Sequence, residues 1–418
     1  MSNDSKIGIK IKEQIEIFSE KIAENLFKPK KKFISQIIFG IQASRDIKLS
    51  SISRSLNEEI KLIKVENRLS RQMQQEDLTA EINKKLIKEG ARRIGKETVL
   101  AVDLSDINKR FAKKMEYLTD VWNGSEGRVD KGYWICEVVG AEVKGEEVTP
   151  MYSELYSQDA RDFESENKQI IKAVEEVNKE VCGRGIWVID RGGDRSKIII
   201  KLNEMRVSFV IRMNLRRNIM DRDQEGRNVL EFAKGFRCDE KINVKIEKEG
   251  YEEEIEVSLG VARGIKVCGI RLNLVVVKGF GEEPMILLTN VEKTGEEILE
   301  IYLTRWKCEE SFRFLKQEYH LEDVRVRSYV GLRNTVVLLE AVFYFLSVHI
   351  GRRLKMNILL KKILEKAKRF FQVSVFKQYA IADGIYRILF NTKWGRDKKL
   401  DEIDVRQGVF DFALEYDF

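Results

Sequence analysis

Three short apolar segments constrain the fold of this chain most strongly. They read TVLAVDLSDI (98–107), GIWVIDRGGD (185–194) and VSFVIRMN (207–214). Apolar runs of this length that are bounded by turn residues are typical of buried strands. Two further runs, GYWICEVVGAEV and EEVTPMYSELY, alternate apolar and polar residues as a partly exposed meander does. Amphipathic helices are predicted between the later strands, so the pattern indicates an α/β fold.

The N-terminal 97 residues are predicted to be helical and basic. Apolar residues recur three or four positions apart from Ile7 to Leu26. A later helix over about 60–73 would expose Arg68 and Arg71. Residues 1–97 hold 21 Lys+Arg and 14 Asp+Glu, which accounts for the whole net charge of +7. A basic segment on a neutral body favours a nucleic-acid partner, although a helical bundle with ordinary solvated charge looks the same.

Changes in the pattern of apolar and polar residues divide the chain into five regions. Between the buried strands and a final helical part lies a stretch of alternating residues with turn glycines and no evident helix. The predicted regions are a helical DNA-binding region (1–97), the first part of an α/β core (98–213), a β-rich insertion (214–280), the second part of the core (281–350) and a helical C-terminal region (351–418).

Several classes of protein are disfavoured. There is no apolar run of about 18 residues, so no membrane-spanning helix is expected. The five cysteines are scattered without a CxxC pair, which indicates reduced, buried thiols in a cytoplasmic protein. The stretch from Gly90 to Lys96 has phosphate-loop spacing, but Glu97 follows where Ser or Thr is needed, so no ATP site is expected.

One helix carries an unusual polar face. In YLTRWKCEESFRFLK (302–316), the residues Tyr302, Arg305, Glu309 and Lys316 are spaced so that they share one side of a helix. Most other residues of this helix are apolar and should be buried. The helix therefore presents a carboxylate flanked by cations.

Two aspartates are predicted at the ends of core strands, where ligands of open α/β sheets collect. Asp103 ends the first strand and Asp190 ends a later one. Together with Glu309 they would repel one another unless divalent cations, Mg²⁺ or Mn²⁺, bound between them. Two such ions would support phosphoryl transfer on nucleic acid. Each acid alone has a simpler explanation as a cap, a turn residue or a helix ion pair, and Asp106 and Asp194 are interpreted in this way; a one-residue shift would exchange Glu310 for Glu309.

These motifs resemble those of the IS4-like (Tn5-type) DDE transposases of bacterial insertion sequences. That family carries a Y-(2)-R-(3)-E-(6)-K signature, which is matched at every spacing by Tyr302, Arg305, Glu309 and Lys316. Its first Asp lies on an early strand, as Asp103 does, and its second opens a DRG element, as Asp190 does. A strand that ends in Thr289-Asn290 before the signature helix is also typical. The resemblance covers about residues 35–390.

The resemblance implies an RNase H-like mixed-sheet catalytic core interrupted by a β-strand insertion, with helical N- and C-terminal regions. It implies that Asp103, Asp190 and Glu309 bind two Mg²⁺ or Mn²⁺ ions. Contacts to DNA are expected from Tyr302, Arg305, Lys316, Arg191, Arg68 and Arg71.

The expected activity is cut-and-paste excision and strand transfer of an insertion sequence. The partners would be double-stranded DNA, as terminal inverted repeats and target, and a second copy of the chain in a synaptic homodimer. No membrane and no ATP would be involved, and the protein would act in the bacterial cytoplasm at the nucleoid.

One departure concerns a flipped base, which some relatives stack on a tryptophan of the insertion. Residues 214–280 contain no tryptophan. Phe232, Phe236 or Tyr251 could substitute, and base stacking is left unassigned. Two other functions stay open: a transposase-derived DNA-binding protein without catalysis, and a metal-dependent nuclease on the same core.

Overall fold

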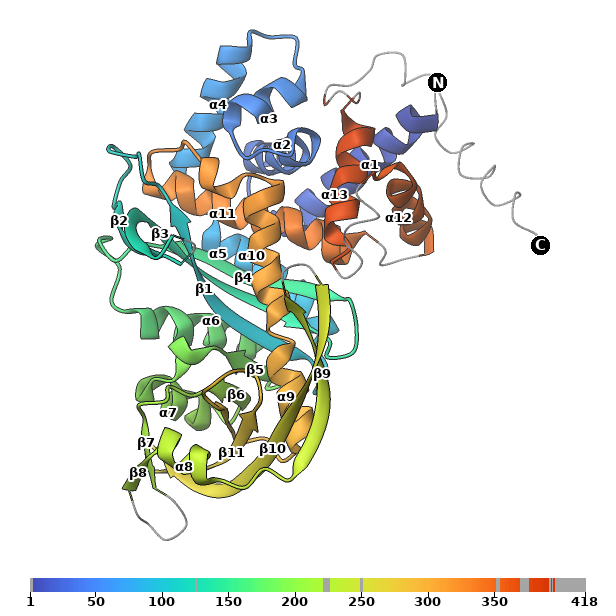
Figure 1. Cartoon of the computed structure of the whole chain (residues 1–418). Coiled ribbons are helices and arrows are strands. Elements are labelled where there is room, and N and C mark those ends of the chain that lie inside the picture. Colours follow the sequence, from blue (N-terminus) through green and yellow to red (C-terminus); the bar gives the residue numbers. More distant parts are fainter. Residues whose placement is uncertain are drawn as a thin grey trace, which may run out of the picture.

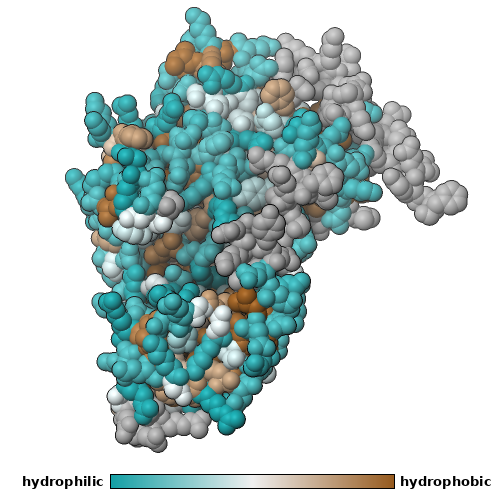
Figure 2. Space-filling view, viewed as in Figure 1, coloured by the Kyte–Doolittle hydropathy of each residue, from teal (hydrophilic) through white to brown (hydrophobic). Residues whose placement is uncertain are grey.

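The computed structural model describes residues 3–124, 126–220, 226–248, 251–350, 354–368 and 376–390, together with Thr392 and Trp394. Twelve strands of this part of the chain form one sheet. Helices from both ends of the sequence gather in a lobe at one end of the molecule, and the β-rich segment forms the other end (Figure 1). Hydrophilic side chains cover most of the face shown in Figure 2.

The core of the sheet has the strand order β4-β3-β1-β5-β6. Strands β1 (Val99–Asn108), β3 (Arg128–Ala141) and β4 (Val148–Tyr156) form an antiparallel meander. Strands β5 (Ile186–Ile189) and β6 (Ser208–Arg212) run parallel to β1 and follow the helices α6 (Glu166–Val181) and α7 (Ser196–Glu204). Parallel neighbours need such helical crossovers. This order and these directions are those of an RNase H-like core, and the predicted α/β fold class is confirmed.

Three details of this part of the chain differ from the prediction. Strand β1 does not end at Asp103 but continues to Asn108, because its second half still pairs with β3 after the pairing with β5 has ended. The short strand β2 (Thr119–Asn123), which pairs with the start of β3, was not expected. Cys182 was expected to be buried but is exposed, because it follows α6 in the left-handed conformation.

The predicted β-rich insertion extends the core sheet. It contains β7 (Asn218–Met220), β8 (Gly226–Asn228), β9 (Glu240–Lys248), β10 (Tyr251–Val267) and β11 (Ile270–Lys278). Strand β12 (Met285–Thr289) pairs with β11 on one side and with β6 on the other. The expectation that this region lacks helices was wrong, because α8 (Val229–Gly235) begins where the Asn228 side chain accepts bonds from two backbone amides.

The N-terminal helices share a core with the C-terminal helices. They are α1 (Asn3–Ile22), α2 (Lys28–Ser44), α3 (Leu49–Leu56), α4 (Leu62–Gln75) and α5 (Thr79–Gly90), followed by the short 3₁₀ turn η1 (Ala91–Arg93). Residues 33–43 of α2 are buried on all sides, since α2 packs against α1, α3, α11 (Tyr329–Tyr344) and α13 (Gln378–Leu389). The division of the chain into five regions stays a prediction.

Helix α11 is the central helix of this lobe. With the π-helical turn η4 (Phe345–His349) it forms a segment, Tyr329–His349, that could cross a membrane by length and composition alone. However, 83% of its apolar window is buried inside the protein, against β4, α2, α4 and α5. A helix that is apolar on all sides and covered by its own chain is a core helix. The helix α12 (Leu354–Lys366) follows it.

A buried pair of carboxyl groups connects α11 to the sheet. Glu137 of β3 and Glu340 of α11 are both fully buried. Burial raises the pKa of Glu137, and the neighbouring Glu340 raises it further; burial also raises the pKa of Glu340. No other described residue donates a hydrogen bond to their four oxygens. A proton on one carboxyl group that is donated to the other therefore stabilises the pair.

The substitution Glu340→Gln tests this pair. Folding raises the pKa of this carboxyl group above its value in the unfolded chain, 4.5. Such a group lowers the stability of the fold as the pH rises above that unfolded-state pKa. The wild-type free energy of unfolding should therefore fall more steeply with rising pH than that of the variant, by up to about 1.4 kcal/mol per pH unit. Urea unfolding over a pH series measures the slope. Glu365→Gln, which changes an exposed acid of α12, is the control, and equal slopes for all three proteins would contradict the interpretation.

Candidate active site

The first two candidate acids lie side by side in the sheet. The parallel register pairs Val102 of β1 with Ile189 of β5, so Asp103 and Asp190 are the next residue on each strand. Adjacent strands are about 4.8 Å apart. Burial raises the pKa of Asp103 to about 7; Arg305 acts in the opposite direction, and Asp190 and Glu309 add to the rise. The structure therefore brings together three acids that are far apart in the sequence.

A tight turn holds the Asp190 carboxylate. The 3₁₀ turn η2 (Arg191–Gly193) begins at Asp190, whose Oδ1 accepts a hydrogen bond of 2.8 Å from the backbone amide of Gly192. A Cβ atom on Gly192 would lie 2.9 Å from Asp190 Oδ1, and one on Gly193 would lie 2.3 Å from Cγ2 of Ile189. Only glycine allows so close an approach at these two positions. Arg191 is exposed beside the carboxylate.

Glu309 reaches the other acids through Arg305. The signature stretch forms α9 (Gly295–Leu303) and α10 (Trp306–Glu318), and Thr304 and Arg305 between them keep helical backbone angles. The Arg305 guanidinium donates to Oε1 of Glu309 and lies 3.6 Å from Oδ2 of Asp103. Burial lowers the pKa of Arg305, but Asp103 and Glu309 outweigh it and the net shift is upward. Arg305 thus supplies the positive charge that holds Glu309 and Asp103 together.

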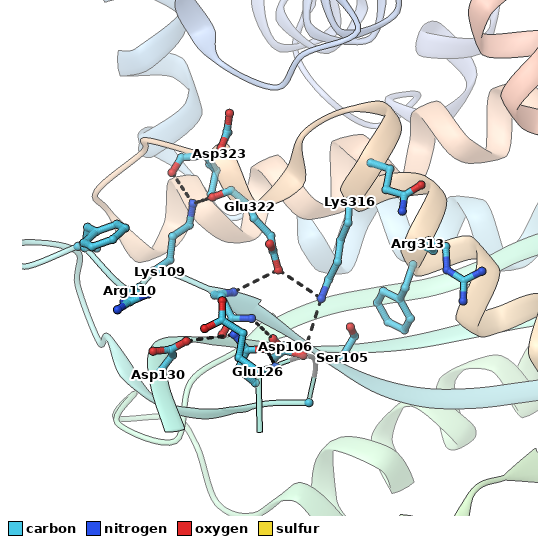
Figure 3. A pocket seen from close by; sticks show the side chains of 18 of the residues that line it. Ser105, Asp106, Lys109, Arg110, Glu126, Asp130, Arg313, Lys316, Glu322 and Asp323 are labelled. Atoms are coloured by element: carbon cyan, nitrogen blue, oxygen red, sulfur yellow. Dashed lines mark hydrogen bonds and ion pairs between the residues drawn. The ribbon is translucent and has the colours of Figure 1, made fainter. Parts of the chain in front are cut away.

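The other two signature residues have different environments. The Tyr302 side chain is only 4% exposed, and the Arg305 guanidinium lies 5.8 Å from the centre of its ring. The predicted contact of Tyr302 with DNA stays a prediction. Lys316 lies further along α10, where its Nζ is 3.7 Å from Asp106 and 3.4 Å from Glu322 (Figure 3).

The neighbouring acids separate into distinct roles. Asp106 was interpreted as a cap or turn residue, which was wrong, because it lies within β1 opposite Trp134 and faces Lys316. Asp194 does end a turn, and its carboxylate binds Arg217 at 2.6 Å. Glu310 contacts Arg313 and the hydroxyl of Tyr379, so Glu309 is the acid of this helix that contacts Arg305.

A pocket of about 960 Å³ adjoins these acids. Asp103 and Glu309 are among its lining residues, whereas Asp190 is not. Its walls come from β1, the β2–β3 hairpin, α10 and the 3₁₀ turn η3 (Leu321–Asp323) (Figure 3). Sequence reasoning did not identify this pocket, since its walls are up to about 200 residues apart in the sequence.

The donor set suits a divalent cation, although the described residues hold no cluster of three or more His, Cys, Asp or Glu groups in a metal-binding arrangement. Carboxylate oxygens are the ligands that Mg²⁺ and Mn²⁺ prefer. The guanidinium of Arg305 lies between Asp103 and Glu309, where it provides the charge that a cation would otherwise supply. A cation at this position would require Arg305 to move.

The expected N-terminal DNA contacts are only partly accessible. Arg68 was predicted to be exposed but is half-buried, because its guanidinium binds Glu58 at 2.7 Å and Gln36 at 2.8 Å. Arg71, one helical turn later on α4, is exposed.

The chain was compared with known protein families, protein sequences and solved structures. Residues 158–346 match the family model described as "Transposase DDE domain", a range that includes Asp190 and Glu309 and begins after Asp103. No curated protein sequence matches the chain. Among solved structures, a chain of the "Cryo-EM structure of piggyBac transposase synaptic complex with hairpin DNA" is similar, with 11% sequence identity, a TM-score of 0.48, and coverage of 96% of this chain and 82% of that chain. The family match supports a DDE transposase domain.

The substitution Arg305→Gln tests the role of this side chain as a counter-charge. Removal of one partner from a mostly buried ion pair costs roughly 3 kcal/mol. Without metal, the variant should therefore be less stable than the wild type at a pH above the Asp103 pKa of about 7. Added Mn²⁺ should raise its melting temperature more than that of the wild type, because the cation restores the lost charge.

Arg313→Gln is the matched control, since Arg313 lies on the same helix and pairs with Glu310. Thermal unfolding with and without Mn²⁺ compares the three proteins. An Mn²⁺ effect on Arg305→Gln that is no larger than the effect on Arg313→Gln would show that Arg305 does not occupy a cation site.

Proposed function

We propose that this chain is a DNA transposase of the IS4-like insertion-sequence type. It would excise its element and join it to new DNA by metal-dependent phosphoryl transfer in the bacterial cytoplasm. The observation that carries this proposal is the placement of Asp103 beside Asp190, with Glu309 linked to Asp103 through Arg305. The domain match over residues 158–346 supports it independently.

Asp103, Asp190 and Glu309 would hold two Mg²⁺ or Mn²⁺ ions. Such ions, when bound, lower the pKa of an attacking water or hydroxyl group and neutralise charge on the leaving oxygen. The fold holds two of these ligands, Asp190 and Asp103, in place. Asp190 is held by the amide of Gly192, and Asp103 is paired with β3 directly after the last residue of β1 that pairs with β5.

Arg305 would change partners when DNA binds. Its guanidinium is planar and can form two parallel hydrogen bonds with a phosphate as well as with a carboxylate. With its carboxylate partners engaged elsewhere, Arg305 would be available to contact the phosphate that is cut. The buried Tyr302 ring, 5.8 Å from the guanidinium, would support Arg305 there, and Lys316, which lines the pocket, would contact a phosphate further along the strand.

The N-terminal helices would bind the terminal inverted repeats, with Arg71 and Arg191 as accessible cations. Two copies of the chain would bring the two ends together in a synaptic homodimer. Because lysines and arginines displace counterions from DNA, end binding should weaken steeply as the salt concentration rises.

The three acids are tested by Asp103→Asn, Asp190→Asn and Glu309→Gln. Each variant should lose at least about 100-fold in the rate of cutting, since changes even in groups that support metal ligands cost 10- to 100-fold. Each should still bind the element ends. The assay is cleavage and joining of DNA that carries the inverted repeats flanking the gene, with Mg²⁺ or Mn²⁺.

Glu310→Gln is the matched control, because Glu310 is the next residue of the helix and contacts Arg313 instead. It should cut at close to the wild-type rate. Unchanged cutting by Glu309→Gln would refute the site assignment. A wild-type protein that binds the ends and never cuts or joins them would instead establish a DNA-binding protein without catalysis.

A further inference from the structure

The loop between β1 and β2 is strongly basic and carries an exposed aromatic ring. It begins Lys-Arg-Phe-Ala-Lys-Lys at residues 109–114. The Phe111 side chain is 86% exposed. Arg110, Lys113 and Lys114 are exposed as well. This concentration of charge lies outside the N-terminal region, to which the sequence assigned the basic character of the chain.

The loop is anchored to a second basic segment. Lys109 is buried, and its Nζ donates to the carbonyl oxygens of Glu322 and Val324. Further along the loop, the backbone amide of Glu116 donates to the carbonyl oxygen of Arg327 at 3.0 Å. The loop is therefore fixed beside the connection between η3 and α11, where Arg325 and Arg327 are exposed.

We call these exposed side chains the basic rim: Arg110, Phe111, Lys113, Lys114, Arg325 and Arg327. Within the described part of the chain none of its five cations forms an ion pair, although Arg110, after the hydrogen bonds from Asn123 and Arg128, contributes to lowering the pKa of Asp130. By contrast, other cations of the pocket wall have acidic partners: Lys316 contacts Asp106 and Glu322, and Arg128 contacts Asp130. The rim thus has positive charge in excess of what the fold uses.

The basic rim is continuous with the pocket beside the candidate acids. Arg110, Phe111 and Arg325 line the same pocket as Asp103 and Glu309. Figure 3 labels Arg110 at this end of the pocket. A chain of phosphates that leaves the acids along this pocket would reach the rim. Surplus lysines and arginines beside such a path are typical of nucleic-acid contacts.

Phe111 indicates whether that nucleic acid is paired or unpaired. A single exposed phenylalanine is ordinary on a protein surface. Here the Arg110 guanidinium lies 5.3 Å from the centre of the ring, so the ring stands among cations. An aromatic ring within a basic groove provides a surface on which a base can stack, and only an unpaired base exposes its face.

We propose that the basic rim holds an unpaired DNA strand that leaves the catalytic pocket, and that Phe111 stacks on one of its bases. The proposal rests on the proposed function for the identity of the strand as DNA. It also supplies an exposed aromatic ring outside the insertion. Phe232 and Phe236 of the insertion are partly buried and stack on each other, with ring centres 5.2 Å apart, and the Tyr251 side chain lies outside the described residues.

The test uses the full chain without divalent ions, so that binding is measured apart from cutting. The probes are a blunt DNA duplex and the same duplex with a short single-stranded overhang that carries 2-aminopurine. Phe111→Ala should bind the overhang DNA about tenfold more weakly and quench the 2-aminopurine less, because one base stack is lost. Its affinity for the blunt duplex should not change. Phe111→Trp should restore both readouts.

Two further variants sharpen the test. Phe390→Ala removes another exposed phenylalanine, at the end of α13 and 68% exposed, and should bind both probes as the wild type does. The double variant Lys113→Gln with Lys114→Gln should lower the slope of log affinity against log salt on the overhang by about 1.4, at 0.7 for each lost phosphate contact.

Phe111→Ala that binds the overhang DNA as tightly as the wild type, or that loses equally on both probes, would overturn the inference. This failure differs from failure of the proposed function. If the element ends are cut through Asp103, Asp190 and Glu309 while Phe111→Ala has no effect on the overhang, only the inference falls. If the overhang depends on Phe111 while no cutting occurs with Mg²⁺ or Mn²⁺, only the catalytic proposal falls.

Discussion

The parallel pairing of β1 with β5 is the constraint on which the rest of the structure depends. It is the junction between the antiparallel meander and all later strands of the sheet. Residues 99–102 and 186–189 are buried along its whole length, so a shift of register would move apolar side chains out of the core. The same register places Asp103 beside Asp190 at the end of the pairing. Burial of apolar side chains therefore positions the two aspartates, and no polar contact between them is needed.

The acids at this junction need compensation, and the protein provides it in two forms. On the pocket side, the guanidinium of Arg305 lies between Asp103 and Glu309. Within the core, Glu137 is paired across the strands with Asp103 and meets Glu340, where a shared proton replaces a counter-charge. The difference matters for function. Under the proposed function Arg305 would give way to cations and phosphate, whereas Glu137 and Glu340 are fully buried and belong to the scaffold.

The sequence predicted the parts of the fold that depend on local pattern. The buried runs around Asp103 and Asp190 became β1 and β5, and the alternating runs became β3 and β4. The sequence pattern did not predict α8 within the β-rich region. A seven-residue helix has too few turns to show helical periodicity, and its start is marked only by the Asn228 cap. Helical spacing placed Tyr302 and Arg305 on one face of the helix. Spacing alone does not predict which residues of that face the rest of the protein buries.

Long-range features were harder to predict for a different reason. The contact of Arg305 with Asp103 joins residues about 200 positions apart, and no local pattern contains it. Net charge did not predict the position of the basic rim either. Residues 98–418 hold equal numbers of acids and bases, so their sum is zero, yet the Glu252-Glu253-Glu254 run of the insertion and the basic rim lie on different strands and loops. A sum over a region hides a local excess that only the fold separates.

Strand β1 links the candidate chemistry to the basic rim. It carries Asp103 and continues five residues further to Asn108, after which the rim begins. At about 3.3 Å per residue, this part of the strand spans about 17 Å. At the rise of duplex DNA, about 3.4 Å per nucleotide, this length would correspond to about five nucleotides, and an unpaired strand that is more extended would need fewer. Because β1 is paired with β3 along this whole length, the spacing is rigid. Under the proposed function, the unexpected extension of β1 beyond Asp103 would set how far from the cut phosphate a base is held.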